Sequence, residues 1–557
     1  MDYTKSIPNV PAMLSRKKSS TLFVACGILF MIMLPLLHKS SPIYQSNLPS
    51  KGPGANPRHY GKFKKTEAEI SIGPKVMDAD YYPMDLASYL SDISYSQFHH
   101  ENYTDLTCSD IRHHGIVHVT EKKELPLNIA SIRDQLINSG FNDVVTSGDN
   151  TGLTDEEIVK KKWFRFVGGS VWLKEHNVHL LVSRVFYSRE GSMIRAAANF
   201  MAVQIYDKDW KELIGHQLTI KNYETGEDQP MVFPTFFDFP FFYSLTYRYY
   251  GPEDPRIILR ETHDGREEPI IIFNMYTQAY NIFKVEDFKL FRAIHILYPF
   301  ANNKLLLLQI EGTVPEEKEK NWVPFFDKDS RSCQWSRGFI YFIYSFSPLE
   351  ILECSLDYGI CQRSFTGDSS FGDTGDMRGG TDLLPIPKEV PQPEGTQSWI
   401  GFARSHLDDC GCADRQYRPN LMILSKQGDE FYLQLISGSL DFNIDVLSWE
   451  GPGHPSCFGI RNVLIPNSLS YWDVVSRDSE GKYEDFLGLT LSEADQNVII
   501  VHIRGLLNYI MDIQVAHNLA EIVSYTPSEM HYRTFKSVSC AVDDALKYCK
   551  AYGETHS

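Results

Sequence analysis

The sequence predicts an all-β protein, a five-bladed β-propeller with a small helical flank that follows an N-terminal transmembrane helix and a stem. Beyond residue 170, short apolar runs such as "EPIIIFNMYT" and "NVIIVHIRGL" recur between turns that contain Gly, Asn or Asp, which is typical of sandwiches, barrels and propellers. Short strands over roughly 450 residues are too many for one sandwich and suit about five four-stranded blades. The glycine fingerprint and regular strand–helix alternation of a doubly wound sheet are absent from the sequence.

The N-terminal segment has the features of an uncleaved signal anchor. Residues 21–37 are uncharged and almost wholly apolar, and Arg16, Lys17 and Lys18 precede them, so the positive-inside rule keeps residues 1–20 in the cytosol. A cleaved signal peptide is the alternative, but the apolar stretch is longer than a usual signal core and no small-residue cleavage site follows it. We expect a single-pass type II membrane protein of the secretory pathway, in the Golgi.

The remaining chain divides into a stem and one lumenal domain. Residues 38–80 are rich in Ser, Pro, Gly and Lys without apolar periodicity, and they predict a flexible stem. The lumenal domain spans residues 81–557. Its helical flank is expected in "NIASIRDQLINSG" from residue 128 and "DEEIVKKKWFRFV" from residue 155, where charges and apolar residues have helical spacing.

Composition argues against one class of partner and leaves another open. The 71 acidic and 54 basic residues give a formal charge of −17, which argues against a nucleic-acid partner because phosphate backbones need clustered Lys and Arg. Neutral sugars remain possible. Aromatic residues make up 13% of the chain, and such side chains either stack on sugar faces or fill β cores.

Nine cysteines follow the apolar segment and predict disulfides in an oxidising compartment. The odd count implies one free thiol or an intermolecular bridge. Cys354 and Cys361 bracket a short loop, and Cys540 and Cys549 could tie down the C-terminal segment. The "CGC" at 410–412 lacks the spacing of a zinc site and favours disulfides. Asn102, in "NYT", is the single glycosylation sequon.

The stretch "YYGPEDPRIILR" at 249–260 predicts a turn that leads into a strand. Pro255 disfavours the α region for Asp254, so we expect Asp254 to be extended and to share a face with Arg256, with Glu253 on the other side. A carboxylate beside a guanidinium at a strand entrance could serve a sugar-transferring site as proton acceptor and anion ligand. The alternative is a proline-containing turn with a surface salt bridge.

Four later stretches place polar groups beside predicted strands: "EKNWVPF" at 319, "MRGGTDLLP" at 377, "SWIGFARSH" at 398 and "LSEADQNVIIVHIRG" at 491. Each has an ordinary structural explanation, such as a salt bridge, a glycine turn, a strand-end histidine or a solvated turn acid. Together they are expected if blade loops deliver side chains to one channel mouth. In "MRGG", the glycines would let a ligand approach the backbone. The residues offered are Lys320, Asn321, Trp322, Arg378, Arg404, His406 and Asp495.

These motifs, in the order "GPEDPRIIL", "FNMYT", "KNWVPF", "YFIYSFSPLEILEC", "RGGTDLLP" and "FARSH", resemble the yeast β-mannosyltransferases, from about residue 85 to 545. That family consists of type II proteins that cap cell-wall mannan with β-1,2-linked mannose. The chain is more distantly similar to the β-mannoside phosphorylases, which are five-bladed propellers. The resemblance implies GDP-mannose as donor, mannan or phosphomannan as acceptor, and transfer with inversion in a single displacement.

The resemblance also implies roles for the residues singled out above. Asp254 would accept the acceptor proton, and cations would stabilise the departing diphosphate. Asp495 would hold mannose hydroxyls, and Tyr276 or Trp322 could stack on a sugar ring or belong to the core. No cofactor is expected beyond the donor, and the one tempting D-x-D candidate, "DAD" at 78–80, lies in or beside the stem, so we predict no metal. The substrate-binding candidates are Glu253, Arg256, Tyr276, Lys320, Asn321, Trp322, Arg378, Arg404, His406 and Asp495.

Two other classes remain open from the sequence. A membrane-anchored β-mannoside phosphorylase or hydrolase would keep the same chemistry, and in a hydrolase Glu253 or Asp495 would have to activate water. A non-catalytic mannan-binding propeller would keep recognition without turnover. The acceptor could also be a glycolipid.

Overall fold

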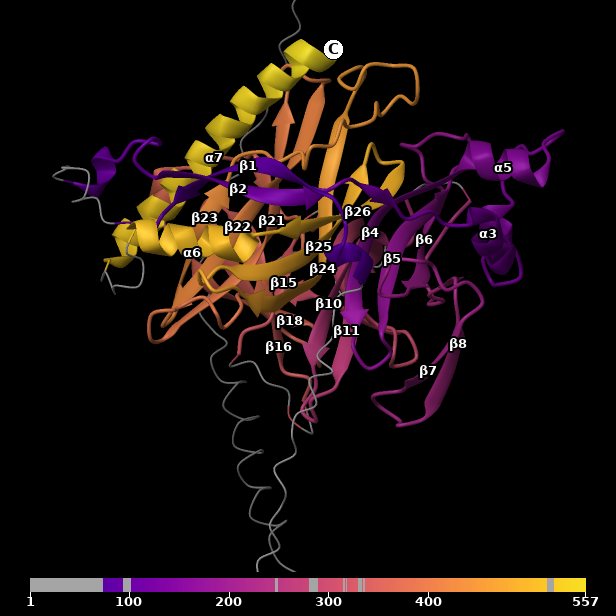
Figure 1. The fold of residues 1–557 in the computed structure, drawn as a ribbon. Coiled ribbons are helices and arrows are strands. Elements are labelled where there is room, and N and C mark those ends of the chain that lie inside the picture. Colours follow the sequence, from indigo (N-terminus) through magenta and orange to yellow (C-terminus); the bar gives the residue numbers. More distant parts are fainter. Residues whose placement is uncertain are drawn as a thin grey trace, which may run out of the picture. The chain divides into compact units, whose positions relative to one another are not determined.

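The computed structural model describes residues 74–93, 102–245, 249–279, 289–313, 316, 318–328, 333, 336–517 and 525–557. The predicted membrane segment, cytosolic tail and most of the stem lie outside these residues. No helix within the described ranges is long and apolar enough to cross a bilayer. Most of the described elements are strands (Figure 1).

Strand pairing groups the described strands into one large sheet and several smaller ones. The large sheet contains β19 (Met377–Arg378), β21 (Thr396–Asp408), β22 (Arg415–Gln427), β23 (Glu430–Ser437), β1 (Tyr81–Leu90), β2 (Arg112–Thr120), β26 (Asn497–Arg504), β25 (Tyr483–Glu493) and β24 (Asn462–Arg477), with β20 (Leu384–Pro385) on β21 and β3 (Lys123–Glu124) on β26.

The smaller sheets are each built from strands that lie close together in the sequence. Their strands are β4 (Trp163–Leu173), β5 (Val178–Tyr187), β6 (Ala198–Tyr206) and β9 (Thr235–Phe236); then the hairpin of β7 (Gln217–Lys221) and β8 (Asp228–Val232); then β10 (Glu253–Glu261), β11 (Glu267–Ala279), β12 (Lys289–Tyr298) and β13 (Lys304–Leu307); and finally β14 (Gln309–Ile310), β18 (Ile360–Thr366), β17 (Leu349–Ser355), β16 (Phe339–Phe346) and β15 (Val323–Phe325). The β7–β8 hairpin is inserted between β6 and β9.

The prediction of five four-stranded blades is wrong, although the strand-rich character holds. The large sheet has eleven described strands, and seven of them close a circuit in which β22, β23, β1, β2, β26, β25 and β24 pair in turn and β24 returns to β22. The circuit exists because β1 pairs with β23 and β2 pairs with β26. These partners lie more than 300 residues apart in the sequence, so local patterns could not reveal that the strands belong to one sheet.

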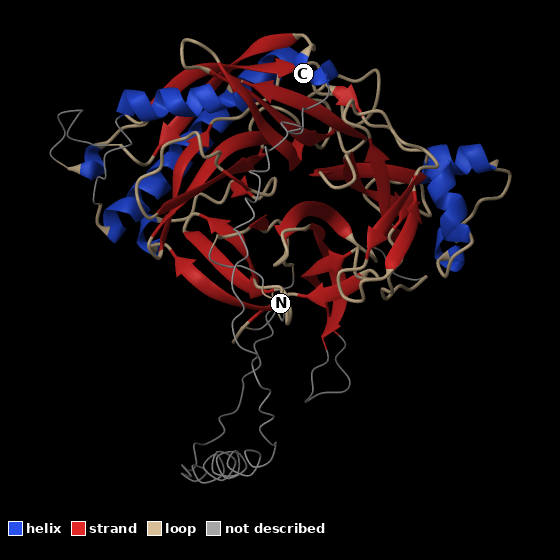
Figure 2. Ribbon diagram, turned by 60° about the horizontal axis from the view of Figure 1, so that its bottom comes forward, coloured by secondary structure: helices blue, strands red, loops and turns tan. Residues whose placement is uncertain are grey.

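The helices lie at the periphery of the strands (Figure 2). The predicted flank is present as α3 (Ile129–Ile137) and α5 (Asp155–Lys162), and Thr154 and Glu157 form a capping box at the start of α5. The predicted second helix ends before "WFRFV", which begins β4. The C-terminal helices were not predicted from the sequence. The remaining described helices are α2 (Pro74–Met77), α4 (Asn142–Val145), α6 (Leu506–His517) and α7 (Pro527–His556), with 3₁₀ turns η3 (Tyr103–Asp105) and η4 (Ser369–Phe371).

Disulfides attach helix α7 to the sheets. Cys540 and Cys549, which were expected to tie down the C-terminal segment, join partners 432 and 139 residues away along the chain. The expected short-loop bridge is also present, and "CGC" supplies two disulfides rather than a zinc site. The described cysteine outside a disulfide is Cys333, which is exposed and accounts for the odd count. The four bridges are Cys108–Cys540, Cys354–Cys361, Cys410–Cys549 and Cys412–Cys457.

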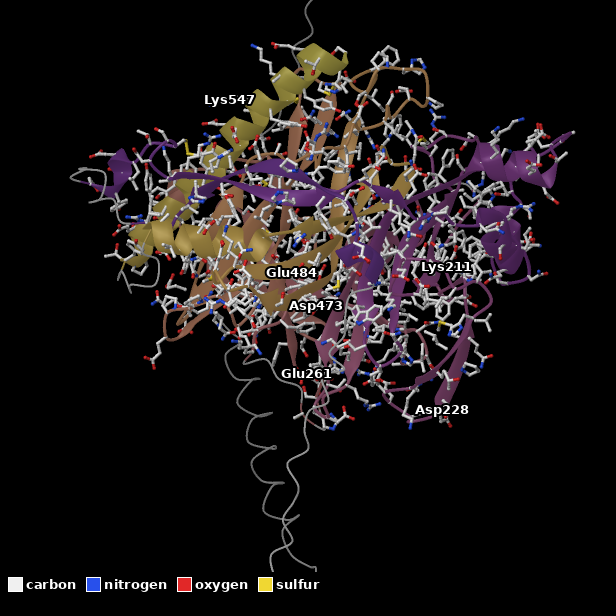
Figure 3. All side chains as sticks on the ribbon, viewed as in Figure 1. Lys211, Asp228, Glu261, Asp473, Glu484 and Lys547 are labelled. Carbon is white, nitrogen blue, oxygen red and sulfur yellow. A yellow bond between two sulfur atoms is a disulfide. The ribbon has the colours of Figure 1, made fainter. Side chains whose placement is uncertain are left out.

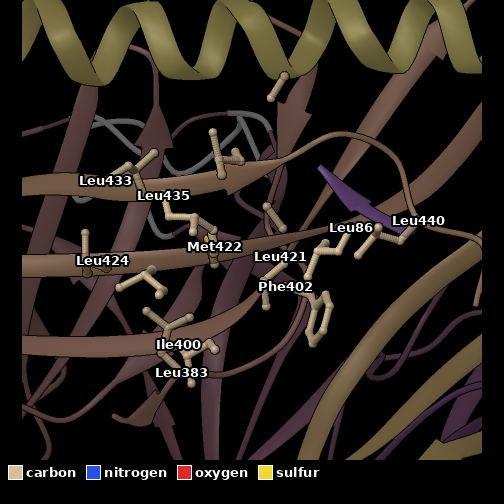
Figure 4. Close-up of a cluster of buried hydrophobic side chains, with 14 of the residues drawn as sticks. Leu86, Leu383, Ile400, Phe402, Leu421, Met422, Leu424, Leu433, Leu435 and Leu440 are labelled. Carbon is tan, nitrogen blue, oxygen red and sulfur yellow. The ribbon is translucent and has the colours of Figure 1, made fainter. Parts of the chain in front are cut away.

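The largest apolar core packs strands of the eleven-stranded sheet against β15–β18 and helices α6 and α7. Figure 4 shows Leu86 of β1 near Leu421, Phe402 and Leu440, which come from segments more than 300 residues away. Each fully buried Leu or Phe contributes about 1.5–3 kcal/mol relative to exposure. Charged side chains such as Lys211, Asp228 and Lys547 are instead exposed (Figure 3). The buried charges, described next, are therefore exceptions to the general distribution.

Candidate active site

The candidate site begins where the chain enters β10. Gly251 has φ +80°, and a Cβ at this position would lie 2.2 Å from the Asn199 carbonyl oxygen, so only glycine fits. Asp254 has φ +52°, and the register of β10 against β11 shifts between Glu253 and Arg256. The expectation of an extended Asp254 is wrong. Aspartate tolerates the left-handed region better than most residues, and such backbone outliers concentrate at functional sites.

The bulge turns both acidic side chains toward one arginine of β5. Arg184 Nη1 donates to Asp254 Oδ1 at 2.9 Å, and Arg184 Nη2 donates to Glu253 Oε2 at 3.0 Å. The predicted separation of the two carboxylates onto opposite faces is therefore also wrong. Arg184 is held in place by a 2.9 Å hydrogen bond from Nε to Asn199 Oδ1, and its guanidinium lies 4.9 Å from the Phe166 ring centre.

The two carboxylates differ in their access to solvent. Glu253 is 6% exposed, and Arg292 Nη2 lies 3.0 Å from its second oxygen, so arginines face both oxygens. Asp254 is 33% exposed. Of the two acids, Asp254 is therefore the one that a substrate can reach.

Arg256 follows the bulge in β10 and is buried. Its Nη1 donates to the Asn467 carbonyl oxygen at 3.4 Å. Burial, together with the nearby Arg404 cation, lowers the pKa of Arg256 to about 10, so it stays charged at neutral pH. Both Arg256 and Arg184 attract the Asp254 carboxylate electrostatically, and Arg184 is in direct contact with it.

The stretches around residues 320 and 404 meet beside this pair of acids. Arg404 Nη2 donates to Asn321 Oδ1 at 2.9 Å, and Asn321 has φ +64°. The glycines of "MRGG" were expected to let a ligand approach the backbone, and this expectation is wrong. A Cβ at Gly379 would lie 1.9 Å from the Asn321 carbonyl oxygen, and one at Gly380 would lie 2.0 Å from the Phe402 carbonyl oxygen, so these glycines admit protein backbone.

Positive charge exceeds negative charge around Asp254. Burial opposes ionisation of Asp254, but Arg184, Arg404, Arg256 and Lys320 outweigh it and hold its pKa below the ordinary value. Burial lowers the pKa of Lys320, and the Asp254 carboxylate opposes that change. Five cations thus surround two carboxylates among the described residues: Arg184, Arg256, Arg292, Lys320 and Arg404 around Glu253 and Asp254. This excess suits an anionic ligand.

Asp495 lies close enough to Asp254 for their charges to interact. Trp449 Nε1 donates to Asp495 Oδ2 at 3.2 Å, and Arg461 Nη1 lies 3.5 Å from the same oxygen. Burial raises the pKa of Asp495, with Arg461 acting in the opposite direction. Its φ of +52° places it in a turn, as predicted.

Arg378 and His406 lie at the margin of the cluster. Arg378 pairs in register with Arg404 across β19 and β21, and its side chain is exposed. The His406 ring lies 5.0 Å from the Tyr417 ring. Burial, followed by the Arg415 cation, lowers the pKa of His406 to about 4, so it is neutral at pH 7.

The two candidate stacking residues have different surroundings. Tyr276 is half-buried, and its ring lies 5.0 Å from the Arg292 guanidinium, which places it behind the Glu253 ion pair. Trp322 is buried in the core, where it donates to Glu319 Oε2 at 3.2 Å. It therefore takes the core role that the sequence had left open. Asn102 is exposed, so its amide is accessible for glycosylation.

Sequence reasoning missed several members of the cluster. One signal was available, because Arg184 lies in the largely apolar run "VHLLVSRVFYS", whose first ten residues form β5 and are all buried. A charged residue in a buried strand needs a charged partner. No comparable signal pointed to the others, whose relevance depends on distant contacts. The missed residues are Arg184, Arg292, Trp449, Tyr417 and Arg461.

The described residues contain no evident metal-binding site. No group of three or more His, Cys, Asp or Glu residues there is arranged to hold an ion. The absence of a metal requirement stays a prediction.

Comparisons with known proteins agree with the predicted family. A family model described as beta-mannosyltransferases matches residues 107–548. Beta-mannosyltransferase 1 of Komagataella phaffii is 36% identical over 484 residues, covering 84% of this chain and 72% of that protein. Beta-mannosyltransferase 2 of the same species is 36% identical over 510 residues, covering 89% and 74%.

A more distant relative aligns over nearly the full length. Beta-mannosyltransferase 7 of Candida albicans is 30% identical over 645 residues, covering 99% of this chain and 97% of that protein. A solved glycoside hydrolase is 9% identical with a TM-score of 0.31, covering 62% of this chain and 88% of that one, a likeness that supports no inference. The family match and these relatives show that the chain belongs to the β-mannosyltransferase family and is a mannosyltransferase.

Proposed function

We propose that the protein transfers mannose from GDP-mannose to mannan or phosphomannan with inversion, forming a β-1,2 linkage, and that Asp254 is the proton acceptor. One observation carries the proposal: Asp254 is a partly exposed carboxylate within a cluster that holds more cations than acids. Membrane anchoring and lumenal placement in the Golgi remain predictions beside it.

The charge excess matches the leaving group. When the bond from mannose C1 to the diphosphate oxygen breaks, its electron pair stays on that oxygen and GDP leaves with added negative charge. Arginines that are already fixed in position can stabilise this charge without reorganising. Arg256, Arg404 and Lys320 all act electrostatically on Asp254, so these cations could hold the diphosphate on one face of the mannose ring while Asp254 serves the acceptor hydroxyl on the other. A neutral ligand would leave this positive charge unbalanced.

The proton balance requires one acceptor. An acceptor-sugar hydroxyl oxygen attacks C1 from the face opposite the diphosphate, a new C1–O bond forms, and the hydroxyl proton passes to Asp254. The lowered pKa of Asp254 keeps it ionised and ready to accept. A weak base suffices because the transition state resembles an oxocarbenium ion, so the attacking hydroxyl becomes strongly acidic as its bond forms.

Hydrolysis fits the same cluster less well. A hydrolase would need a second carboxylate to activate water, and Glu253 is buried with arginines facing both of its oxygens. Asp495 is bound by Trp449 and faces Arg461. Phosphorolysis would use the same cations for a smaller anion, so product analysis has to separate it from transfer.

The test uses wild-type protein and Asp254→Asn, each incubated with GDP-mannose and a mannan oligosaccharide. GDP release is measured by a coupled assay, and the anomeric proton of the product is examined by NMR. We expect a β-mannoside with wild type and a loss of about 10³-fold or more in Asp254→Asn, the upper range for a general base. Asp228→Asn, at an exposed carboxylate of β8, is the matched control and should retain activity.

Four results would contradict the proposal. An α-mannoside product would exclude inversion. Retained activity in a folded Asp254→Asn protein would exclude the assigned base. Consumption of phosphate without GDP release would favour a phosphorylase, and binding of mannan without any turnover would favour a lectin.

A further inference from the structure

The segment of residues 447–461 adjoins the turn that carries Asp495. Gln496 Nε2 donates to the carbonyl oxygens of Ser448 at 3.2 Å and Trp449 at 3.0 Å. Trp449 in turn donates to Asp495, and Arg461 at the other end of the segment faces the same carboxylate. The segment is therefore a direct extension of the candidate site.

The backbone of this segment is fixed at its middle. Cys457 forms a disulfide with Cys412, its N–H donates to the His556 carbonyl oxygen at 3.0 Å, and its carbonyl oxygen accepts from Ala413 N at 3.1 Å. A further 3.0 Å hydrogen bond from Phe458 N to the Pro455 carbonyl oxygen closes a turn. The side chains on either side of Cys457 are thus presented from a defined backbone.

Apolar side chains on this segment face solvent. Phe458 is 51% exposed and Ile460 is 38% exposed. The exposed His454 ring stacks on Phe458 with ring centres 4.8 Å apart and an 8° angle between the planes. Exposed flat apolar groups that adjoin a polar site commonly mark a ligand surface.

The charge of the segment fits a neutral polymer. Glu450 and Arg461 are its only acidic and basic residues apart from His454. The anion-binding charge lies instead around Asp254. Sugar rings have apolar C–H faces that pack on aromatic rings and hydroxyls that pair with polar groups. This segment offers aromatic rings, and its two ends bring Trp449 and Arg461 together beside Asp495 as polar groups.

We propose that residues 447–461 bind the polysaccharide chain of the acceptor, at sugar units beyond the one that receives mannose, through the His454–Phe458 pair and Ile460. The proposal rests on the proposed transfer reaction and adds the site that senses acceptor length. Short acceptors would engage only the residues around Asp254 and Asp495, whereas long acceptors would also cover Phe458.

The test compares a mannobiose acceptor with a long mannan oligosaccharide in wild type and Phe458→Ala. We expect KM for the long acceptor to rise about tenfold, as for the loss of one aromatic contact, with kcat, the KM for mannobiose and the KM for GDP-mannose unchanged. Phe458→Trp should restore the long-acceptor KM. The matched control is Tyr358→Ala, which removes an aromatic side chain that is 78% exposed in the turn between β17 and β18.

Equal KM values for wild type and Phe458→Ala with the long acceptor would overturn the proposal while leaving the transfer reaction intact. An equal rise for mannobiose would also overturn it, because the effect would then not depend on length. If wild type releases no GDP, the transfer reaction itself fails. Titration of the same mannan oligosaccharide by calorimetry, without donor, then decides: about tenfold weaker binding by Phe458→Ala supports the surface, and equal binding rejects it.

Discussion

The two ends of strand β10 carry buried charges of the same chemical types but in different arrangements. At the far end, Arg260 pairs across the strands with Glu268, which is wholly buried, and Arg260 Nε donates to it at 2.9 Å. At the entrance, Arg184 binds both Glu253 and the partly exposed Asp254, and four further cations surround them.

The difference shows how a structural ion pair can be told from a site. Arg260 and Glu268 balance each other and are 8% and 0% exposed, so the pair offers neither net charge nor an accessible carboxylate. The cluster at the entrance has excess positive charge, an accessible carboxylate and a left-handed backbone at Asp254. A ligand can complete only the second arrangement.

Breaking the Arg260–Glu268 ion pair should have the largest effect on stability. Glu268→Gln would leave Arg260 buried without its counter-ion, and we expect a loss of about 3–5 kcal/mol in the free energy of unfolding. Urea denaturation measures this loss. Activity per folded molecule should be unchanged, because the pair is at the end of β10 away from Asp254.

A double variant sharpens this prediction. Arg260→Met with Glu268→Leu removes both charges together, and we expect a stability within about 1 kcal/mol of wild type or above it. If the double variant lost as much unfolding free energy as Glu268→Gln, Arg260 or Glu268 would have to stabilise the fold through a further partner.

Changing the open cluster should affect activity instead. Arg184→Lys removes the fork that binds both carboxylates, because an ammonium group cannot reproduce two parallel N–H donors. We expect kcat to fall about 10²–10³-fold, measured with saturating GDP-mannose. Arg266→Lys, at a partly exposed arginine that pairs with Asp264, is the control and should retain activity. Equal activity in Arg184→Lys would show that Asp254 needs no such fork.

Asp382 lies between the two ends and should make stability depend on pH. It interacts with Arg256, and with Arg260 it lines a cavity of about 560 Å³. Burial raises the pKa of Asp382 to about 7. Its folded state binds more protons than the unfolded state between pH 4 and 7, so stability falls as pH rises through that range.

The conservative variant tests this expectation. Asp382→Asn keeps an oxygen that can accept from Leu469 N, as Asp382 Oδ1 does at 3.1 Å. From pH 5 to pH 8, wild type should lose about 2–3 kcal/mol that Asp382→Asn retains. Denaturation curves at both pH values measure the difference. A parallel pH dependence in the two proteins would contradict the raised pKa.

Local sequence patterns predicted individual strands and helices, but they could not predict which distant strands pair. Apolar runs revealed strands such as β11 and β26, and charge spacing revealed α3 and α5. The pairing of β1 with β23 depends on contacts across most of the chain, which no local period encodes. Helix α7 was not predicted, although its cysteines had indicated that the segment is tied down.

The site was predictable in its members more than in its geometry. Asp254, Arg256, Lys320, Arg404 and Asp495 do come together. The bulge at Asp254 reversed the expected facing of the two acids, because the rule of alternating sides applies only to a regular strand. Arg184 was missed because its role depends on a carboxylate 70 residues further along the chain.

The smallest expected effect comes from chelation, which tests whether the cations at the entrance of β10 are sufficient for the leaving group. A divalent metal, where transferases use one, neutralises the departing diphosphate. Here Arg184, Arg256 and Arg404 supply positive charge at a fixed place beside Asp254, so we expect EDTA to change GDP release less than about twofold. Strict dependence on added Mn²⁺ would show that these arginines serve the carboxylates alone. The charges around Glu253 and Asp254 would then resemble the Arg260–Glu268 pair, in which the arginine only balances its own carboxylate.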